Sequence, residues 1–377
     1  AWGSYDAGRI AILKRMADRM WEADSTAYVI LEHFGDFFEE NELSNYGMML
    51  WRKAQEQYAE ASMSYLGNSD FSKVYHGAYG FNKSHAVGFM ESHDEERMTY
   101  KNKEYGNSSG TYNIKYENIA LDRMELCTVF FLSIPGPKLI WQFGELGYDY
   151  SINYGGRLGN KPIKWEYYDE PDRKDVYNLY SIMNFLRANY PVFSNGTTGV
   201  ELSVGNGVAG KRIKLSGAGP NVVILGNFDV VETTVTPAFQ HGGRWFEYFR
   251  DDTLMVTNTN EGIVLAPGEY RIYTDQKLME SPVAVETVIP RAFVLKQNYP
   301  NPFNPKTAIS YLLTADSNVE LSIYDITGRK ITTLVNDYQG AGHYTLQFNA
   351  SHLASGVYMY KINAGRHSET KKMVVLK

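Results

Sequence analysis

Up to about residue 190, short apolar runs alternate with longer segments of helical periodicity, and this order constrains the fold more than any other feature. The runs AYVILEHF, NYGMMLW, AVGFMES and KLIWQFGE predict four strands. The helical segments are GRIAILKRMADRMW, RKAQEQYAEASMSYL, NIALDRMELCTVFFLSI and RKDVYNLYSIMNFLRANYP. Because strands that alternate with helices usually pair in parallel, residues 1–190 are predicted to form a parallel sheet or barrel.

The pattern changes after residue 190. Residues 191–276 contain short alternating strands with Gly-rich turns, as in VELSVGNGVAGKRIKLSGAGPNVVILGNFD, which predicts an antiparallel β-sandwich. Residues 277–290 are predicted to be a linker. Residues 291–377 are again all-β, with strict alternation in VELSIYDITGRKITTLV and GVYMYKI. This last region opens on NYPNPFNP, whose prolines favour an extended backbone.

Composition narrows the classes of partner. The chain has 377 residues and a net charge of −6, so a nucleic-acid partner, which calls for a basic face, is not expected. No apolar run reaches the length of a membrane span, and the single cysteine, Cys127, lies in an apolar segment typical of a buried thiol. The 29 Tyr, 18 Phe and 6 Trp residues suit a carbohydrate binder, because aromatic rings stack on sugars, but they suit an aromatic core equally well.

Three of the four predicted strands run into acidic residues. YVIL is followed by Glu32, GFM by Glu91 and then by His93 and Asp94, and LIWQFG by Glu145. In a parallel barrel the carboxyl ends of the strands and the loops after them form the active site, so these side chains are expected to converge. Two carboxyl groups, one protonated and one ionised, are the usual equipment for glycoside hydrolysis.

Structural alternatives exist for each of these residues. An acid after a strand is often a solvated loop residue or a helix N-cap. Glu95 and Glu96 are expected to begin a solvated turn, and Arg97 could be a plain ion-pair partner. A metal site is the other alternative, since His and carboxylate both bind metals, and its ligands would be His33, Asp36, His93 and Asp94. No metal site is predicted, because the His-Asp pair ends a strand here and lies on helices in the metal-dependent phosphohydrolases.

Several of these segments resemble motifs of the α-amylase family of glycoside hydrolases. GFMESHDEERM resembles the strand-seven motif, which supplies a His-Asp pair, and YVILEHFG resembles the strand-five motif, which ends in the catalytic Glu. GPKLIWQFGELGYDYS resembles strand eight, and RLGNKPIKW with LRANYPVF resembles the segment that closes the barrel. The motifs keep the family's order over residues 1–190. The resemblance implies a partial (β/α)8 TIM barrel that contains strands five to eight.

The resemblance also implies roles for individual residues. Glu32 would be the general acid/base. Asp94 would be the third carboxylate, which binds sugar hydroxyls and stabilises the transition state, and His93 would hydrogen-bond the sugar in the same subsite. Further candidates for substrate contact, beside the matched positions or at the pocket rim, are His33, Arg97 and Glu145. No cofactor is assigned; calcium is possible in the parent protein, where most of the family's calcium ligands would lie upstream.

One departure from the family pattern concerns the nucleophile. In the family it is an Asp in an Arg-x-Asp motif at the end of strand four, and no such motif precedes Glu32 in a strand context. Asp6 and Asp18 do not fit, since one is in the lead-in and the other lies in the first helical segment. The chain is therefore expected to be the second half of a barrel, without useful hydrolase activity on its own.

The function that the resemblance implies is a secreted enzyme that cleaves α-1,4-glucans such as starch with retention. One alternative is a transglycosylase or branching-type enzyme of the same family, in which a sugar hydroxyl replaces water. The other is a non-catalytic surface glycan-binding protein.

Residues 291–377 resemble the sorting domain of type IX secretion system cargo, a small immunoglobulin-like sandwich. NYPNPFNP, YDITGR and LASGVYMYKI carry the resemblance. It implies passage through the periplasm and export across a Gram-negative outer membrane, followed by release or attachment at the cell surface. The type IX secretion machinery is then an expected partner, beside an α-glucan.

Overall fold

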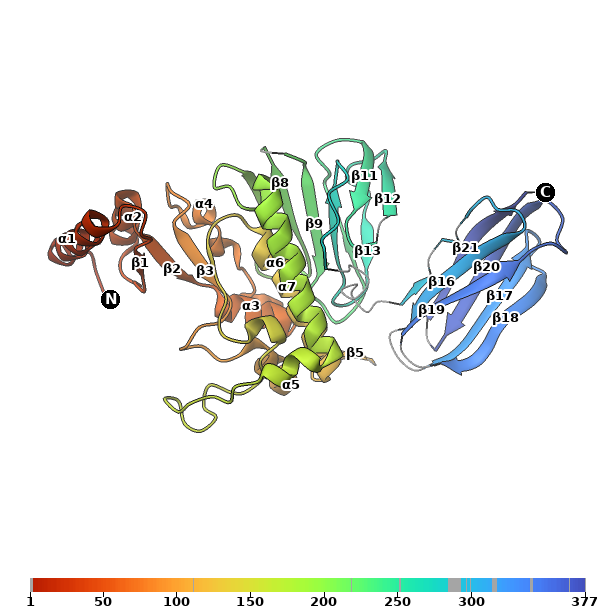
Figure 1. The fold of residues 1–377 in the computed structure, drawn as a ribbon, viewed down its shortest axis with the longest axis horizontal. Helices are drawn as coiled ribbons and strands as arrows, with labels where there is room; N and C mark the ends of the chain where they lie inside the picture. The colour runs from red at the N-terminus through yellow and green to blue at the C-terminus, as the bar shows by residue number, and fades with distance from the viewer. Residues whose placement is uncertain are drawn as a thin grey trace. The chain divides into compact units, whose positions relative to one another are not determined.

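The computed structural model forms two compact units, Ala1–Pro290 and Arg291–Lys377 (Figure 1). The structure describes residues 3–110, 112–217, 219–250, 252–283, 293–295, 297–298, 300–313, 317–339, 342–365 and 367–376. The first unit contains both of the regions predicted as 1–190 and 191–276. Part of the predicted linker, residues 284–290, lies outside the described residues.

Helices of the first unit follow most of the predicted periodic segments. They are α1 (Ala7–Ala23), α2 (Phe37–Tyr46), α3 (Gln55–Ser62), α4 (His76–Tyr79), α5 (Met98–Tyr105), α6 (Glu117–Ser133) and α7 (Pro171–Asn189). Short 3₁₀ helices are η1 (Leu66–Asn68), η2 (Ser72–Val74), η3 (Gly144–Leu146), η4 (Trp165–Asp169) and η5 (Pro191–Phe193). The sequence does not predict α2 and α5. The Asp36 carboxylate caps α2 by accepting a hydrogen bond from Phe38 N at 2.8 Å.

The predicted strands pair in parallel in one sheet, in the order β1-β2-β3-β6. These strands are β1 (Ile30–Leu31), β2 (Met49–Lys53), β3 (Ala86–Phe89) and β6 (Lys138–Leu139). They are shorter than the apolar runs that predict them, and β1 and β6 have only two residues each. Because parallel strands run in one direction, their carboxyl ends lie at the same edge of the sheet, and this edge positions the acidic residues that follow them.

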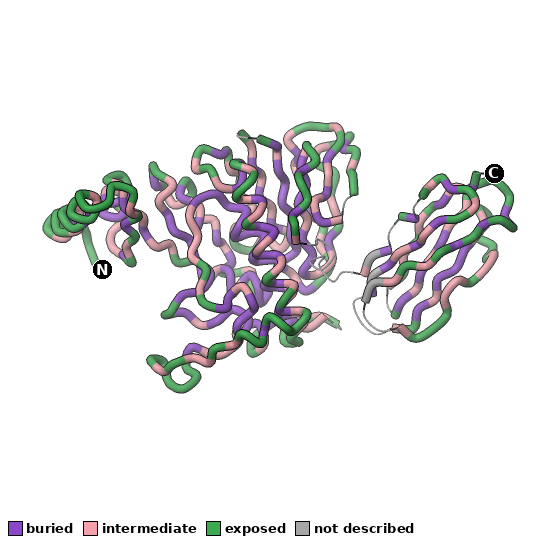
Figure 2. The backbone as a smooth tube through the Cα atoms, in the orientation of Figure 1, coloured by how far each residue is buried: buried purple, intermediate pink, exposed green. Residues whose placement is uncertain are grey.

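The central helix α6 is buried along almost its whole length. Apolar residues occur on all of its sides, beside the buried Arg123 and Glu125, which agrees with its position inside the unit. The helix α7 packs beside it, and Figure 2 shows that buried residues run through these helices and the neighbouring strands. Cys127 is a buried free thiol here, as the sequence predicts. Gly226 lets a strand approach α6 closely, because a Cβ at that position would lie 2.5 Å from Phe130.

Antiparallel strands make up the rest of the first unit. They are β7 (Gly199–Ser203), β8 (Gly210–Ser216), β9 (Val222–Asn227), β10 (Thr233–Val235), β11 (Gly243–Glu247), β12 (Asp252–Val256), β13 (Ile263–Leu265) and β14 (Tyr270–Thr274). Six of them form a sheet in the order β12-β11-β14-β9-β8-β7, and β10 pairs with β13. The central strand β9 is buried at every position and contributes to the core shared with α6. A small hairpin of β4 (Ser108–Ser109) and β5 (Tyr112–Asn113) completes the unit.

A fully buried lysine, Lys211 on β8, lies in this core. Its ammonium group donates hydrogen bonds to Ser69 Oγ at 3.1 Å and to the carbonyl oxygens of Val204 and Gly205, both at 2.9 Å. It also lies 5.3 Å from the centre of the Phe71 ring. Burial lowers the pKa of Lys211 from its ordinary value of 10.5 to about 8.

This shift predicts that the first unit gains stability as the pH rises from 8 to 10.5. In that range the unfolded state binds a proton at Lys211 that the folded state does not, so the free energy of unfolding increases with pH, by about 3 kcal/mol for a shift of this size. Urea titrations at several pH values across this range measure the free energy of unfolding and test this prediction. The variant Lys211→Met is expected to lose this part of the slope, and Lys214→Met, a control on the same strand, is expected to keep it. Equal slopes in all three proteins would contradict the prediction.

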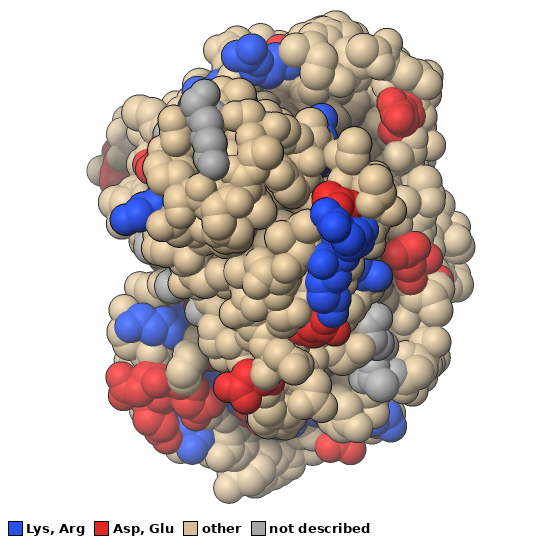
Figure 3. Space-filling model, turned by 90° about the vertical axis from the view of Figure 1, so that its right-hand side faces the viewer, with Lys and Arg blue, Asp and Glu red and all other residues tan. Residues whose placement is uncertain are grey.

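The C-terminal unit contains two antiparallel sheets. Its strands are β15 (Val294–Leu295), β16 (Lys306–Leu313), β17 (Ser317–Asp325), β18 (Lys330–Gln339), β19 (Gly342–Asn349), β20 (Gly356–Ala364) and β21 (His367–Val375). The sheet orders are β15-β16-β19 and β18-β17-β20-β21, and apolar side chains from both sheets share one core. On the face shown in Figure 3 most of the surface is uncharged, and Lys and Arg gather in one short run with acidic side chains at both ends.

No helix in the described part of the chain combines the length and the apolar character needed to cross a bilayer.

Candidate active site

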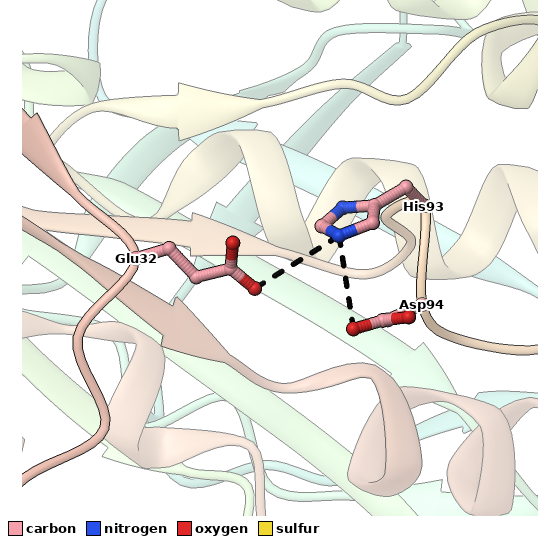
Figure 4. Close-up of side chains that lie close together, drawn as sticks. All are labelled: Glu32, His93 and Asp94. Carbon is pink, nitrogen blue, oxygen red and sulfur yellow. Dashed lines mark ion pairs between the residues drawn. The ribbon is translucent and has the colours of Figure 1, made fainter. Parts of the chain in front are cut away.

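Glu32, His93 and Asp94 come together at the carboxyl edge of the parallel sheet (Figure 4). Glu32 follows β1 directly, and His93 and Asp94 lie in the loop after β3. The His93 Nε2 atom is 4.0 Å from Glu32 Oε1 and 3.7 Å from Asp94 Oδ2. These distances are too long for direct hydrogen bonds, so the three groups face a shared space that a polar ligand group can enter. All three side chains are exposed, at 44%, 44% and 57%.

Two tryptophan rings flank the imidazole of His93. Trp51, on β2, and Trp141, just after β6, each have their ring centre 5.9 Å from that of His93. Both rings are partly exposed. Neither ring is among the site residues predicted from the sequence, and a tryptophan in a strand pattern gives no signal that separates a site residue from a core residue.

The loop that carries His93 and Asp94, residues 90–98, is held by its own side chains. The buried Glu91 carboxylate accepts a hydrogen bond from Met98 N at 2.7 Å, which ties the loop to the start of α5. The buried Arg97 guanidinium donates to Ser92 O at 2.6 Å and to Glu95 O at 3.2 Å. Burial raises the pKa of the Glu91 carboxyl, and Arg97 opposes this shift. Arg97 therefore lies inside the loop, not in the cluster with Glu32.

The expectation that Glu95 and Glu96 begin a solvated turn is wrong. Glu95 is buried, accepts a hydrogen bond from Ser92 Oγ and lies 3.1 Å from the Lys53 ammonium group. Glu96 accepts hydrogen bonds at 2.8 Å from Ser151 Oγ and from Ile152 N. Lys53, Ser151 and Ile152 come from distant parts of the chain, so no local pattern could have indicated these contacts.

A long loop between β6 and η4 reaches the cluster through Arg157. The Arg157 guanidinium donates to Asp94 O at 2.8 Å and lies 3.3 Å from Asp94 Oδ1. The sequence analysis places Arg157 only in the segment RLGNKPIKW, without a role. Its contact with Asp94 orients the carboxylate beside His93.

His33 is not brought into the cluster. Its side chain is buried, with Nε2 2.8 Å from Glu39 Oε1, and the Arg9 guanidinium binds the same carboxylate at 2.6 Å. Burial lowers the pKa of His33, whereas Arg9 holds the pKa of Glu39 below its usual range. His33 thus packs behind β1, on the side opposite to Glu32.

Glu145 also lies apart from the cluster. It belongs to η3 and is half-buried, and burial raises the pKa of its carboxyl. A small hollow lies beside the neighbouring Gly144. Its lining residues are Met90, Glu91, Phe131, Leu139, Ile140, Trp141, Gly144 and Tyr180.

Metal binding in the described residues is limited to one group of three side chains, Glu32, His93 and Asp94, whose ligand atoms lie within 4.8 Å of one another. This set does not fit calcium, which takes six to eight oxygen ligands. The predicted alternative with His33 and Asp36 is not assembled, because His33 faces Glu39 and Asp36 caps α2.

Comparison with known proteins identifies the C-terminal region. The family model described as secretion system C-terminal sorting domain matches residues 297–376. This region is therefore a sorting domain of the type IX system, as the sequence predicts, and it implies a secreted or surface-located protein. No curated protein sequence matches the chain.

Solved structures similar to the chain are glycoside hydrolases. The α-amylase from Geobacillus thermoleovorans, solved with acarbose, is 14% identical with a TM-score of 0.54; the match covers 72% of this chain and 59% of that chain. An Anoxybacillus α-amylase is 16% identical with a TM-score of 0.52, covering 72% and 57%. A cyclomaltodextrinase is 13% identical with a TM-score of 0.51, covering 70% and 43%. The matched part of the chain thus resembles the α-amylase fold and covers less than two thirds of the length of these proteins.

Proposed function

From a chain with the α-amylase fold and a C-terminal secretion sorting domain, we propose that Glu32, His93 and Asp94 belong to a secreted glycoside hydrolase that acts on α-1,4-glucans with retention. The observation that carries the proposal is the convergence of these three side chains, from the ends of two parallel strands, within 4.8 Å of one another. Carboxylates at the ends of separate strands are the arrangement that glycoside hydrolysis needs.

Each residue has a role in this proposal. Glu32 donates its proton to the glycosidic oxygen as the bond to the anomeric carbon breaks, and then takes a proton from the water that replaces the leaving group. Asp94, oriented by Arg157, binds sugar hydroxyls and stabilises the positive charge that develops on the ring. His93 donates a hydrogen bond to a hydroxyl of the same sugar. The flanking rings of Trp51 and Trp141 offer apolar surface to the sugar.

Retention also needs a nucleophilic carboxylate, which the proposal places outside this chain. We propose that the four parallel strands, β1, β2, β3 and β6, correspond to strands five to eight of an eight-stranded barrel. The nucleophile would then lie at the end of strand four. The parent protein is then the hydrolase, and this chain by itself binds glucan without cleaving it.

A non-catalytic glycan-binding protein is the second candidate function. The solvent exposure of Glu32, His93 and Asp94 favours it, because catalytic carboxyl groups usually work in partly desolvated sites. A parent protein that binds starch and releases no reducing sugar would have this second function. A transglycosylase would form new linkages in place of reducing ends.

Glucan binding by the chain tests the proposal. Maltoheptaose is expected to bind in isothermal titration, and the β-linked cellohexaose is expected not to bind. Asp94→Asn and His93→Ala are each expected to weaken maltoheptaose binding about tenfold, since each removes a hydrogen bond to a charged or polar partner. Matched controls are Asp337→Asn and His352→Ala, exposed positions in the C-terminal unit. Equal affinity in the site variants and in their controls would contradict the proposal.

A further inference from the structure

Two aromatic side chains are exposed on the loop between β6 and α7. The rings of Tyr154 and Trp165 are 52% and 72% exposed. Each rests edge-to-face on a second aromatic ring: Tyr154 on Tyr150 and Trp165 on Phe143, both with ring centres 4.9 Å apart. Large aromatic rings that are this exposed and yet supported from below are typical of a binding surface.

The loop is held in one conformation by polar contacts and by a strained residue. The Lys161 ammonium group donates to the carbonyl oxygens of Tyr154 at 3.0 Å, Gly156 at 2.8 Å and Gly159 at 3.0 Å. Phe143, which supports Trp165, has a φ of 60°, in the left-handed region that a bulky side chain rarely adopts. Strain of this kind costs about 1–3 kcal/mol and clusters at functional sites. Lys161 thus ties together the backbone that follows Tyr154, and Trp165 rests on a residue with a strained backbone.

The same loop is continuous with the candidate active site. Arg157, three residues after Tyr154, binds Asp94, and Ser151 and Ile152 bind Glu96 in the loop that carries it. At the other end, Phe143 is two residues from Trp141, whose ring is beside His93. In Figure 1 this is the yellow-green loop that protrudes at the lower left. The loop that carries the two exposed rings therefore contacts the loop that carries His93 and Asp94.

We propose that Tyr154 and Trp165 form an outer binding surface for glucose units of an α-glucan whose inner units occupy the cluster at Glu32, His93 and Asp94. This inference rests on the proposed function. A glucose ring presents C–H groups on its two faces, and these pack on the electron-rich face of an aromatic ring. The hydroxyls at the edge of the sugar stay in water. The two rings offer apolar contact area and carry no charge, so an uncharged polysaccharide is a fitting ligand for them.

Chain-length dependence of binding distinguishes this surface from the inner site. Maltotriose is short enough to occupy the inner site alone, whereas maltoheptaose can reach the loop. In isothermal titration of the full chain, Trp165→Ala is expected to weaken maltoheptaose binding about tenfold and Tyr154→Ala by a smaller factor. Both variants are expected to bind maltotriose as the unaltered chain does. Trp165→Phe, which keeps an aromatic face, is expected to retain most of the affinity.

A control variant and the possible outcomes distinguish a failure of the outer surface from a failure of the proposed function. Tyr338→Ala removes a ring that is 63% exposed in the C-terminal unit and is expected to change neither affinity. Unchanged maltoheptaose affinity in Trp165→Ala and Tyr154→Ala, or an equal loss for both sugars, would overturn the outer surface and leave the inner site standing. If the unaltered chain binds neither sugar, the proposed function fails and the inference fails with it.

Discussion

The chain, purified on its own, is expected to release no measurable reducing sugar from maltoheptaose. Any turnover is expected to be several orders of magnitude slower than the roughly 10 s⁻¹ of a typical enzyme. Retention requires a second carboxylate about 5 Å from the acid/base, to attack the anomeric carbon. The buried acids that follow Glu32 in the described chain are engaged elsewhere. Glu39 binds Arg9, and Glu40 accepts a hydrogen bond from Arg52 at 2.7 Å.

Asp94 is the other carboxylate at the cluster, and its contact with Arg157 suits charge stabilisation rather than attack. The assay is reducing-sugar release over many hours, with Glu32→Gln as the control. Activity that survives in Glu32→Gln belongs to a contaminating amylase. Turnover near 10 s⁻¹ that disappears in Glu32→Gln would show that the chain holds a complete catalytic set, contrary to this account.

Replacing Arg123 is expected to destabilise the first unit strongly. Arg123 is fully buried on α6, and its guanidinium donates five hydrogen bonds to backbone carbonyls at distances between 2.7 and 3.3 Å. The acceptors are Ala61 and Ser62 at the end of α3, Asn227 at the end of β9, and Phe228 and Asp229 just after it. One side chain therefore joins the parallel-sheet region to the antiparallel sheet. Arg123→Met removes these five hydrogen bonds from a buried site and is expected to cost about 3–5 kcal/mol.

Urea denaturation followed by tryptophan fluorescence measures this cost directly. All six tryptophans precede residue 291, so the signal reports on the first unit alone. Arg123→Lys is expected to lose part of the stability, because an ammonium group has three donors and cannot span five acceptors. Arg19→Met removes an exposed arginine paired with Glu22 and serves as the control. A midpoint for Arg123→Met equal to that of Arg19→Met would contradict the prediction.

Long periodic segments were predictable from the sequence, and a helix stabilised by distant partners was not. The helix α7 follows its apolar periodicity, and α6 follows a long apolar segment that is buried on all sides. In contrast, α2 has the sequence FFEENELSNY, which shows no clear apolar stripe. Two of its three glutamates, Glu39 and Glu40, are buried because Arg9 and Arg52 neutralise them, and these arginines lie 30 and 12 residues away. Pairings of this kind depend on the tertiary fold, which local propensity does not encode.

Three of the candidate site residues predicted from the sequence lie together in the structure. The sequence did not show which of the other candidates lie outside this cluster. The motifs at Glu32 and at His93–Asp94 lead to the cluster that the structure contains. His33 follows Glu32 directly, but successive residues of an extended chain point to opposite sides, so it faces Glu39 in the interior. Arg157 reaches Asp94 through a loop of more than ten residues, whose path the sequence does not specify.

An azide experiment tests most directly whether this is a retaining α-glucosidic site that lacks only its nucleophile. The chain is incubated with 4-nitrophenyl α-maltotrioside and sodium azide, and the products are identified by NMR. The account predicts β-maltotriosyl azide: azide attacks the anomeric carbon from the face opposite to the aryl oxygen, the carbon–oxygen bond breaks, and Glu32 supplies the proton to the leaving nitrophenolate. Asp94→Asn is expected to suppress the product. The α-azide would reveal a carboxylate nucleophile within the chain, and the absence of any adduct despite maltotrioside binding would favour a glycan-binding protein; either result would contradict the account.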